Sequence, residues 1–336
     1  MTIPALSIVV IGRNEGQRLL RCLQSIQRIH NVSGQIETIY VDSASTDGSP
    51  ELAKSFGARV IALNTDRPTA ALGRDTGWKN ASSDFVLFLD GDTVLHPDFP
   101  AKAFSVITAD PMIAAVWGHL REIHPEHSLY NRILDLDWIF PVGEVDLCGG
   151  NVLMRRCALE VAGGYDSTLI AGEEPELCCR IKSHGYRIFN IDAPMVGHDL
   201  AMTQFHQYWK RSVRTGHAYA EVSRRYRDTE NPFWHSERIN NLKRGIFWGL
   251  SPIVAIAVST LSQAALPIVL WCVLFVALSL RSSWSARWKS RDILALVLYG
   301  MHSHFQQIPI CIGQLQYVFG QKQGEKKRLI EYKGNA

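Results

Sequence analysis

Short apolar runs alternate with amphipathic stretches over the first 120 residues or so, and this alternation constrains the fold more than any other feature of the chain. The apolar runs predict buried strands, and the stretches with apolar residues at helical spacing predict helices. The predicted strands are 6–12, 36–42, 59–63 and 85–90, and the predicted helices are 15–29, 49–57 and 69–82. Strands separated by helices indicate βαβ crossovers and a parallel sheet, in which ligands bind beyond the carboxyl ends of the strands.

The composition narrows the class of protein. A chain of 336 residues is long enough for one large domain with an appendage, or for two domains. The formal net charge of +3 is too small to indicate nucleic acid as a partner. The seven cysteines include no CxxC pair, so we expect a reducing compartment rather than a disulfide framework or a zinc ribbon. The first apolar run follows no basic start and is too short for a signal peptide, which favours a first strand.

Polar and acidic residues follow three of the predicted strands: Asn14-Glu15, Asp42 and Asp90-Gly91-Asp92. The carboxyl ends of parallel strands lie at one edge of a sheet, so these side chains are expected to meet there. Two carboxylates one residue apart repel each other, and burying them is costly unless a cation lies nearby. With a diphosphate they would form an oxygen cage suited to Mg²⁺ or Mn²⁺. A solvated turn is the alternative interpretation of this motif by itself.

A second group of acids and glycines lies between residues 143 and 198. Glu173 and Glu174 precede Pro175 at a predicted helix start, where the helix dipole alone would also favour acids. His198 follows another strand-like run. Its imidazole is a reasonable third ligand for Mn²⁺, although a lone histidine is more often structural.

Together these pieces resemble the family 2 glycosyltransferases, nucleotide-sugar-dependent enzymes with the GT-A fold. The resemblance covers about residues 6–215. Its pieces, in the family's order, are SIVVIGRNE, YVDSASTDGS, LGRDTGWKNASSDFVLFLDGDT, CGGNVLMRRCALEVAGGYD, AGEEPELCCRIKSHGYRI and FHQYWKRSVRTG. It implies an α/β fold with a Rossmann-like, mostly parallel sheet flanked by helices, followed here by a hydrophobic or amphipathic helical membrane region.

The resemblance also implies roles for individual residues. It places nucleotide-sugar contacts at Asn14, Glu15, Asp42, Arg74, Asp90, Gly150, Asn151, Arg211 and Arg214. It implies Asp92, with His198, as ligands of Mn²⁺ or Mg²⁺. The family usually has Glu-Asp where this chain has Glu173-Glu174, so Glu174 is the implied general base and Glu173 is the alternative.

The stretch 246–280 contains no charged residue in 35 positions. A spanning helix needs roughly 20 apolar residues, so the stretch is long for one span and short for two. A tight hairpin of two short helices is favoured over one tilted span and over a buried core helix. Basic segments lie on both sides, at 202–244 and 281–291, and the positive-inside rule then predicts a cytoplasmic catalytic domain.

We therefore divide the chain into a catalytic domain (1–215), a basic amphipathic connector (216–245), a membrane helix or hairpin (246–280), and interfacial helices with a basic tail (281–336). Within the last part, 292–319 is expected to lie in the interface or against the hairpin. The predicted function is inverting transfer of a sugar from a nucleotide sugar, preferably a UDP-sugar, to a lipid-linked or membrane-proximal hydroxyl or phosphate. The other classes are a metal-dependent nucleotidyltransferase, for which a Gly-rich, Lys-bearing loop is missing, and a non-catalytic membrane scaffold.

Overall fold

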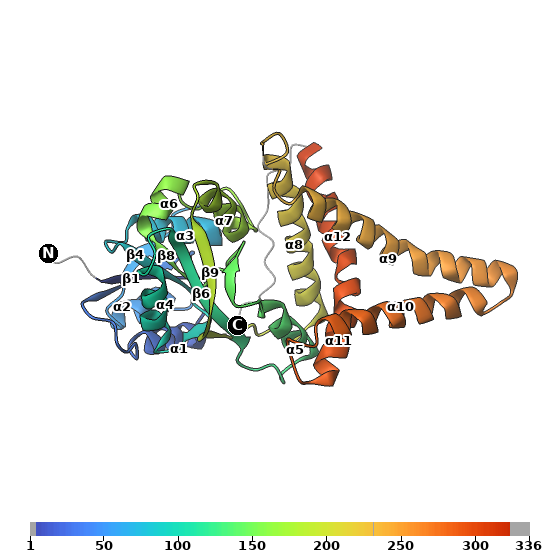
Figure 1. Cartoon of the computed structure of the whole chain (residues 1–336), viewed down its shortest axis with the longest axis horizontal. Helices are drawn as coiled ribbons and strands as arrows, with labels where there is room; N and C mark the ends of the chain where they lie inside the picture. Colours follow the sequence, from blue (N-terminus) through green and yellow to red (C-terminus); the bar gives the residue numbers. More distant parts are fainter. Residues whose placement is uncertain (1–4, 231, 323–336) are drawn as a thin grey trace. The chain divides into compact units, whose positions relative to one another are not determined.

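The computed structural model describes residues 5–230 and 232–322. Within them the chain forms two compact units. The first contains residues 5–123 and 138–200, and the second contains 124–137 and the described residues from 201 onward. The first unit is built on one sheet, whereas the second is helical (Figure 1). The boundary at 200 places the segment 201–215 in the helical unit, whereas the predicted catalytic domain extends to residue 215.

A single sheet forms the centre of the first unit. Its strands are β1 (Leu6–Gly12), β2 (Ile36–Asp42), β3 (Arg59–Ala62), β4 (Phe85–Asp90), β5 (Thr93–Leu95), β6 (Ile113–Glu122), β7 (Gly143–Val145), β8 (Val152–Arg155) and β9 (Arg187–His198). The helices of this unit are α1 (Gln17–Ile26), α2 (Ser49–Ser55), α3 (Ala70–Lys79), α4 (Phe99–Ile107), α6 (Arg156–Ala162) and α7 (Glu173–Ser183). The strand order is β3-β2-β1-β4-β8-β6-β9-β5, with β7 paired to β9. The predicted α/β sheet flanked by helices is confirmed.

The four strands predicted from the sequence are present and run parallel to one another. β1 pairs with both β2 and β4, and β2 pairs with β3. The side chains of β1 and β4 are mostly apolar and buried on both faces, as expected for parallel strands covered by helices, whereas β2 is buried in its second half and β3, at the edge of the sheet, is only partly buried. Helix α3 packs on β1 and β2, and it approaches so closely that a Cβ at Gly77 would lie 2.2 Å from Cγ1 of Val9. Because β1, β2 and β4 run parallel, their carboxyl ends meet at one edge of the sheet.

The rest of the sheet is mixed in direction. β8 runs antiparallel to β4 and β6, while β6 and β9 are parallel. The short strand β5 follows Asp92 directly and pairs antiparallel with β9, so that Thr93 lies opposite His198. The backbone N–H of Asp199 donates to the carbonyl oxygen of Asp92 at 2.9 Å. This register brings the end of β9 beside the turn that follows β4.

The second unit is a set of packed helices. They are α5 (Leu129–Asp135), α8 (Phe205–Arg225), α9 (His235–Ser262), α10 (Leu266–Ser285), α11 (Ile293–Phe305) and α12 (Gln307–Lys322). Helices α8 and α12 lie in close contact at two glycines. A Cβ at Gly216 would lie 2.0 Å from the carbonyl oxygen of Ile310, and a Cβ at Gly313 would lie 2.0 Å from that of Val213. The two helices could not approach this closely with any other residue at these positions.

The charge-free stretch 246–280 forms the end of α9 and most of α10, joined by a turn at 263–265 (Figure 1). Among the described helices, α9 and α10 are long and apolar enough to cross a membrane. Residues 292–319 form α11 and most of α12, which pack on α10 and on α9, respectively. The basic tail from residue 323 onward lies outside the described residues.

The polar segment 302–307, which interrupts the apolar sequence, packs inside the helical unit. His302 is buried, and its Nδ1 lies 2.8 Å from the Tyr208 hydroxyl oxygen. Nε2 of His304 lies 3.2 Å from Oγ of Ser282. These histidines therefore have polar partners within the unit, which lowers the cost of burying them.

Candidate active site

The loops that follow β1 and β2 hold each other through Asn14 and Asp42. Asn14 has a φ of 53°, which Asn adopts more readily than most residues, and its Oδ1 accepts a hydrogen bond from the Thr46 N–H at 2.7 Å. The Asn14 N–H donates to Oγ of Ser45 at 2.9 Å. The buried Asp42 carboxylate accepts from the Ser45 N–H at 2.9 Å and from the Tyr40 hydroxyl at 3.2 Å. Two predicted nucleoside contacts are thus fixed next to each other.

Gly91 allows the Asp90-Gly91-Asp92 turn to lie directly on the end of β1. The Gly91 N–H donates to the carbonyl oxygen of Ile11 at 2.8 Å. A Cβ at Gly91 would lie 3.1 Å from that oxygen and 3.2 Å from Cγ of Glu15. Glu15 therefore lies against this turn, and the two acids after β4 are placed next to the predicted nucleoside residues after β1.

Asp90, Asp92 and His198 form a group whose ligand atoms all lie within 4.8 Å of one another. Nε2 of His198 lies 3.4 Å from Oδ2 of Asp92, and Asp92 is only 1% exposed. The indole of Trp138 packs edge-on against the His198 ring, with 4.7 Å between ring centroids. Two carboxylates and an imidazole are donors that suit Mn²⁺, and a cation among them would offset the cost of burying the acids. The group therefore fits a divalent cation.

The Arg74 side chain, 4% exposed, joins this group to the start of α7. Its Nη2 lies 2.7 Å from Oδ1 of Asp90, and its Nη1 lies 3.1 Å from Oε1 of Glu173 and 3.0 Å from Oε1 of Glu174. Burial opposes the charged guanidinium, but the surrounding carboxylates outweigh burial and raise the pKa of Arg74. A Cβ at Gly150 would lie 2.0 Å from Nη2, so the arginine reaches the acids across a glycine.

Asn151 holds Asp90 from the opposite side. Its Oδ1 accepts from the Asp90 N–H at 3.0 Å, and its Nδ2 donates to Oδ2 of Asp90 at 3.3 Å. Both carboxylate oxygens of Asp90 thus have a donor, one from Asn151 and the other from Arg74. The structure places Gly150 and Asn151 at this group, where the sequence predicts them.

Glu173 and Glu174 differ in their access to solvent. The Glu173 side chain is 4% exposed and lies against Arg74, whereas the Glu174 side chain is 18% exposed. Burial and the neighbouring Glu173 carboxylate raise the pKa of Glu174 to about 7, although Arg74 opposes the shift. A carboxylate with a pKa near neutrality is suited to proton transfer, so Glu174 has the properties of a general base.

Residues 7–161 match the profile of glycosyl transferase family 2. This part of the chain is a family 2 glycosyltransferase domain. A curated relative, glycosyltransferase AglE of Haloferax volcanii, is 22% identical over 196 residues. The alignment covers 56% of this chain and 64% of AglE, so the chain spans somewhat less than two thirds of that relative.

Solved glycosyltransferase structures share the fold. The mannosyltransferase PcManGT from Pyrobaculum calidifontis, in complex with GDP-Man and Mn²⁺, superposes with a TM-score of 0.65 at 19% identity, over 94% of this chain and 88% of that one. TarS 1–349 of S. aureus, in complex with UDP, gives a TM-score of 0.51 at 15% identity, over 96% and 93%. The fold of the glycosyltransferase domain is therefore GT-A.

Two of the residues predicted to contact the nucleotide sugar belong to the helical unit. Arg211 and Arg214 lie on α8, outside the glycosyltransferase domain. Nη1 of Arg211 lies 3.8 Å from Oδ2 of Asp137, which also belongs to the helical unit. His302 and Arg211 both favour the charged carboxylate, and the pKa of Asp137 is lowered although its burial acts in the opposite direction. The structure therefore gives Arg211 an acidic partner that the sequence did not indicate.

Some side chains that line the candidate site of the glycosyltransferase domain were missed by the sequence analysis. Trp138 packs on His198, and the ring centroid of the buried Tyr165 lies 6.0 Å from Cζ of Arg74. Sγ of Cys148 lies 3.4 Å from Sγ of Cys178, which is on α7 one turn after Glu174. Cys148 and Tyr165 both stand in the quoted piece CGGNVLMRRCALEVAGGYD, so their neighbours in the sequence were a usable signal. Trp138 lies in none of the quoted pieces.

Proposed function

We propose that this protein transfers a sugar from a nucleotide sugar to an acceptor at a membrane, with inversion at the sugar carbon. The observation that carries the proposal is the continuous chain of contacts from the Asp90, Asp92 and His198 group, through Arg74, to Glu174. Such a chain offers a diphosphate site and, next to it, a base, which are the two things that sugar transfer needs.

The donor side uses the residues at the carboxyl ends of the strands. Asn14, Glu15 and Asp42 bind the nucleoside, and Asp90 with Gly150-Asn151 binds the ribose and diphosphate. Asp92 and His198 hold Mn²⁺ or Mg²⁺, which when bound neutralises charge on the diphosphate as it leaves. Arg74 supplies a fixed positive charge beside the same diphosphate. A UDP-sugar is the preferred donor, but the two solved neighbours bind GDP-Man and UDP, so both nucleotides belong in a donor screen.

The acceptor side uses Glu174. Its carboxylate takes the proton of the acceptor hydroxyl while the hydroxyl oxygen attacks C1 of the sugar from the face opposite the diphosphate, which gives inversion. Glu173 is more enclosed and holds Arg74 in place. This division supports Glu174 over Glu173 as the base. A phosphate acceptor is already ionised and needs no base, so the effect of losing Glu174 separates the two kinds of acceptor.

The arginines of α8 have a separate role in the proposal. Arg211 and Arg214 are spaced by three residues on one helix, so they share a face. We assign them to the departing nucleoside diphosphate, where negative charge increases during the reaction.

The helical unit attaches the protein to a membrane. Helices α9 and α10 have the length and composition of membrane helices, and the basic segments on both sides favour anionic headgroups on the cytoplasmic face. This attachment supports a lipid-linked or membrane-proximal acceptor.

The test is donor turnover by membranes that contain the protein. Labelled UDP- and GDP-sugars are supplied with Mn²⁺, and release of nucleoside diphosphate is measured together with label in extracted lipid. Asp92→Ala is expected to abolish release, whereas the exposed Asp98→Ala is the matched control and keeps it. Glu174→Gln is expected to abolish transfer to a hydroxyl, with exposed Glu160→Gln as its control. No release by the unmodified protein with any donor would contradict the proposal.

A further inference from the structure

The charge-free parts of α9 and α10 are shorter than a bilayer is thick. Residues 246–262 of α9 extend about 25 Å and residues 266–280 of α10 about 22 Å at 1.5 Å per residue, whereas the hydrocarbon core is about 30 Å thick. The two helices also diverge from the turn that joins them (Figure 1), so at least one is tilted in a membrane and reaches less deeply. Although the complete helices are long enough to cross a membrane, their charge-free parts, once tilted, do not reach across the hydrocarbon core.

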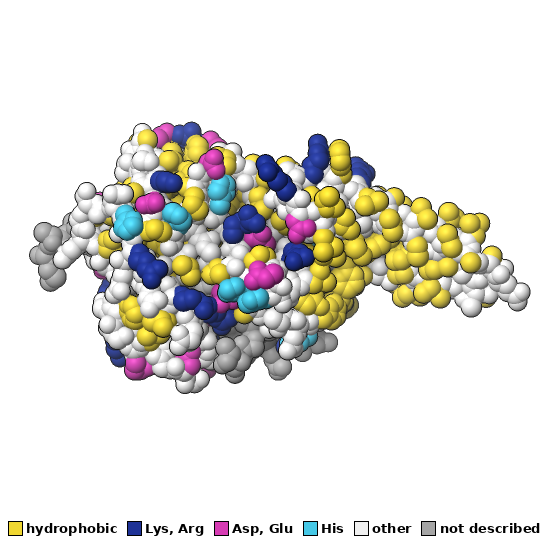
Figure 2. Space-filling view, turned by 90° about the horizontal axis from the view of Figure 1, so that it is seen from below, with side chains coloured by type: hydrophobic (Ala, Val, Ile, Leu, Met, Phe, Trp, Pro, Cys, Tyr) yellow, Lys and Arg dark blue, Asp and Glu magenta, His cyan; other side chains and the backbone are white. Residues whose placement is uncertain are grey.

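The surface of the hairpin is apolar on nearly every side. Large side chains of both helices are exposed, among them Ile253, Leu261, Leu270 and Val273. Figure 2 shows hydrophobic side chains covering this part of the molecule on the visible face. Exposed apolar surface of this extent is rare on soluble monomers and is typical of a surface in contact with lipid.

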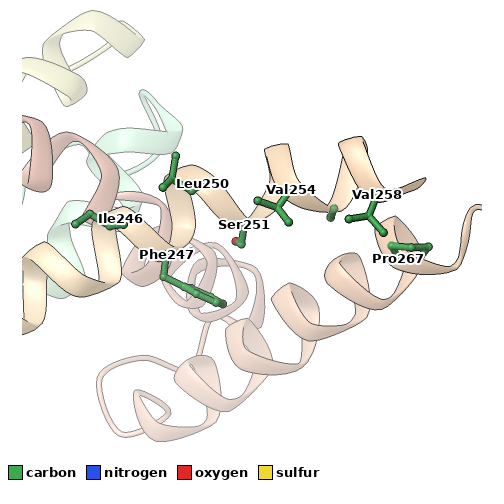
Figure 3. Close-up of a pocket in the computed structure, with 8 residues that line it drawn as sticks. Ile246, Phe247, Leu250, Ser251, Val254, Val258 and Pro267 are labelled. Atoms are coloured by element: carbon green, nitrogen blue, oxygen red, sulfur yellow. The ribbon is translucent and has the colours of Figure 1, made fainter. Parts of the chain in front are cut away.

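An open groove of about 440 Å³ lies between the two helices (Figure 3). Its lining is apolar, with Phe247, Leu250, Val254 and Val258 from α9 and Pro267 from α10. Ser251 is the polar residue of the lining, and its Oγ accepts a hydrogen bond from Nε1 of Trp271 at 2.9 Å. The groove therefore suits hydrocarbon chains rather than water, because it offers water few polar partners.

Three backbone donors at the end of the hairpin are satisfied by groups of α9. The N–H of Gln263 donates to the carbonyl oxygen of Thr260, and that of Ala264 donates to the carbonyl oxygen of Ser259 at 3.1 Å. At the start of α10, Pro267 has no N–H, and the Ile268 N–H donates to Oγ of Ser259 at 3.1 Å. Such caps also occur at helix ends in water, but in hydrocarbon each unsatisfied N–H group would cost several kcal/mol.

The hydroxyl groups near the turn are satisfied in the same way. Oγ1 of Thr260 donates to the carbonyl oxygen of Ile256, and Oγ of Ser262 donates to that of Val258 at 2.7 Å. The turn, 263–265, carries no charged residue. The turn is thus neutral, and the hydroxyl groups of Thr260 and Ser262 beside it are paired within α9, which suits an apolar solvent.

The two ends of the hairpin, in contrast, are basic. Exposed Lys243 and Arg244 precede the charge-free part, and exposed Arg281, Arg287 and Arg291 follow it. Exposed Trp284 and Trp288 stand between these arginines, as in the aromatic belts of membrane interfaces. Both ends therefore fit one anionic membrane surface.

From this geometry we propose that α9 and α10 form a re-entrant hairpin, which enters an anionic phospholipid bilayer from one side and keeps its turn within the hydrocarbon. The inference rests on the membrane attachment in the proposed function and adds the depth and topology. Lipid chains fill the groove between the helices. The far side of the membrane is never reached.

The first test is the accessibility of a cysteine at the turn. The full chain carries Ala264→Cys with the exposed Cys157 and Cys272 changed to Ser, and it is reconstituted in vesicles of phosphatidylcholine and phosphatidylglycerol. A membrane-impermeant maleimide is added outside or, in a second sample, trapped inside. Labelling of Cys at 264 is expected to be at least ~10-fold slower than in detergent from both sides. The matched control, Asp228→Cys in the exposed loop after α8, is labelled in vesicles as fast as in detergent.

The other outcomes overturn the inference. If both cysteines are labelled fast, one only by outside reagent and the other only by trapped reagent, the hairpin crosses the membrane. Fast labelling of both by reagent on the same side would mean that the hairpin never enters it.

The second test places a charge at the turn. Ala264→Asp is expected to weaken binding to the same vesicles about 100-fold, because Asp costs about 3 kcal/mol in the hydrocarbon centre, whereas Ala264→Leu binds as tightly as the unmodified chain. Binding of Ala264→Asp that equals that of Ala264→Leu would also overturn the inference. Nucleoside diphosphate release in detergent is expected to be the same for both variants, so an inactive protein would contradict the proposed function without affecting either membrane result.

Discussion

The acidic site and the turn of the hairpin both pair polar groups within the protein, and they do so by opposite means. In the site, Arg74 is surrounded by the carboxylates of Asp90, Glu173 and Glu174. At the turn, neutral hydroxyl and backbone groups pair with one another, and no charge is present. Charged pairing makes a site that responds to pH and to bound ions, whereas neutral pairing makes a surface that responds to neither. We therefore expect pH and bound ions to affect the acidic site and to leave the turn unaffected.

The largest effect is expected from removing the charge at the centre of the acidic site. Arg74→Met leaves three carboxylates without their cation, and breaking a buried ion pair from one side typically costs about 3–5 kcal/mol. The midpoint of thermal unfolding should fall accordingly, whereas Arg59→Met, at an exposed arginine, should leave it almost unchanged. A stable, active Arg74→Met variant would mean that the acids do not depend on this arginine.

The pH profile distinguishes the two regions directly. Glu174, the proposed base, can accept a proton only when ionised, and its pKa is raised to about 7, so turnover with a hydroxyl acceptor should rise as pH rises through that value. Vesicle binding by the hairpin turn involves no titrating group of the turn and should be constant over the same range. Turnover that stays constant from pH 6 to 8, about one unit either side of that pKa, would contradict the difference in pH response between the two regions.

Gly150→Ala is expected to disturb the acidic site without removing any charge. The added Cβ would lie 2.0 Å from Nη2 of Arg74, so the guanidinium must shift away from Asp90 or Glu174. We expect turnover to fall roughly 10–100-fold, because displacing a positioning group by about 1 Å can cost 10²-fold. Gly149→Ala, at a neighbouring position where a Cβ would meet no atom within 4 Å, is the matched control.

Ionisation of Glu174 should also be visible in stability. Because its folded pKa lies above that of an unfolded Glu, about 4.3, its stabilising contribution is complete below pH 4.3 and is lost as pH rises through 7. In Glu174→Gln the side chain does not ionise, so this loss of stability with rising pH is absent. Relative to the unmodified chain, the variant should therefore gain stability on going from pH 5 to pH 8, measured by thermal unfolding in detergent. An equal difference at both pH values would contradict the shift.

The smallest effect is expected at the turn. Ser259→Ala removes the acceptor of the Ile268 N–H and should weaken vesicle binding about 5–10-fold, the equivalent of about 1 kcal/mol for one neutral hydrogen bond. Ser262→Ala, which removes only a donor to a helix carbonyl, is the comparison variant and should have a smaller effect. Equal effects at both serines would mean that the Ile268 N–H is satisfied by water.

The sequence predicts the parallel half of the sheet well because its signal is local. Each of β1, β2 and β4 contains an apolar run that leads into a polar residue, and such a run identifies a buried strand without reference to its partner. The mixed half depends on pairing between distant segments. β5 and β7 have three residues each and β8 has four, which is too short for a periodic pattern to be recognised.

The same distinction holds for the candidate site. Asp90, Asp92 and Glu174 stand in motifs, so the sequence locates them. The ion pairs of Arg74 with Asp90, Glu173 and Glu174 arise only when α3, β4 and α7 come together. Trp138 on His198 has no local signal at all. The hairpin is predicted from its lack of charge, whereas the donors and acceptors of its turn follow from geometry that composition does not encode.

The contact between α8 and α12 has a consequence for the comparison of homologues. Gly216 and Gly313 face carbonyl oxygens of the opposite helix, those of Ile310 and Val213, rather than each other's side chains. Every residue type carries that oxygen, so no substitution on one helix can make room for a side chain on the other. We therefore expect the two glycines to be retained independently, and these two positions, although closely packed, to show no correlated substitutions in an alignment.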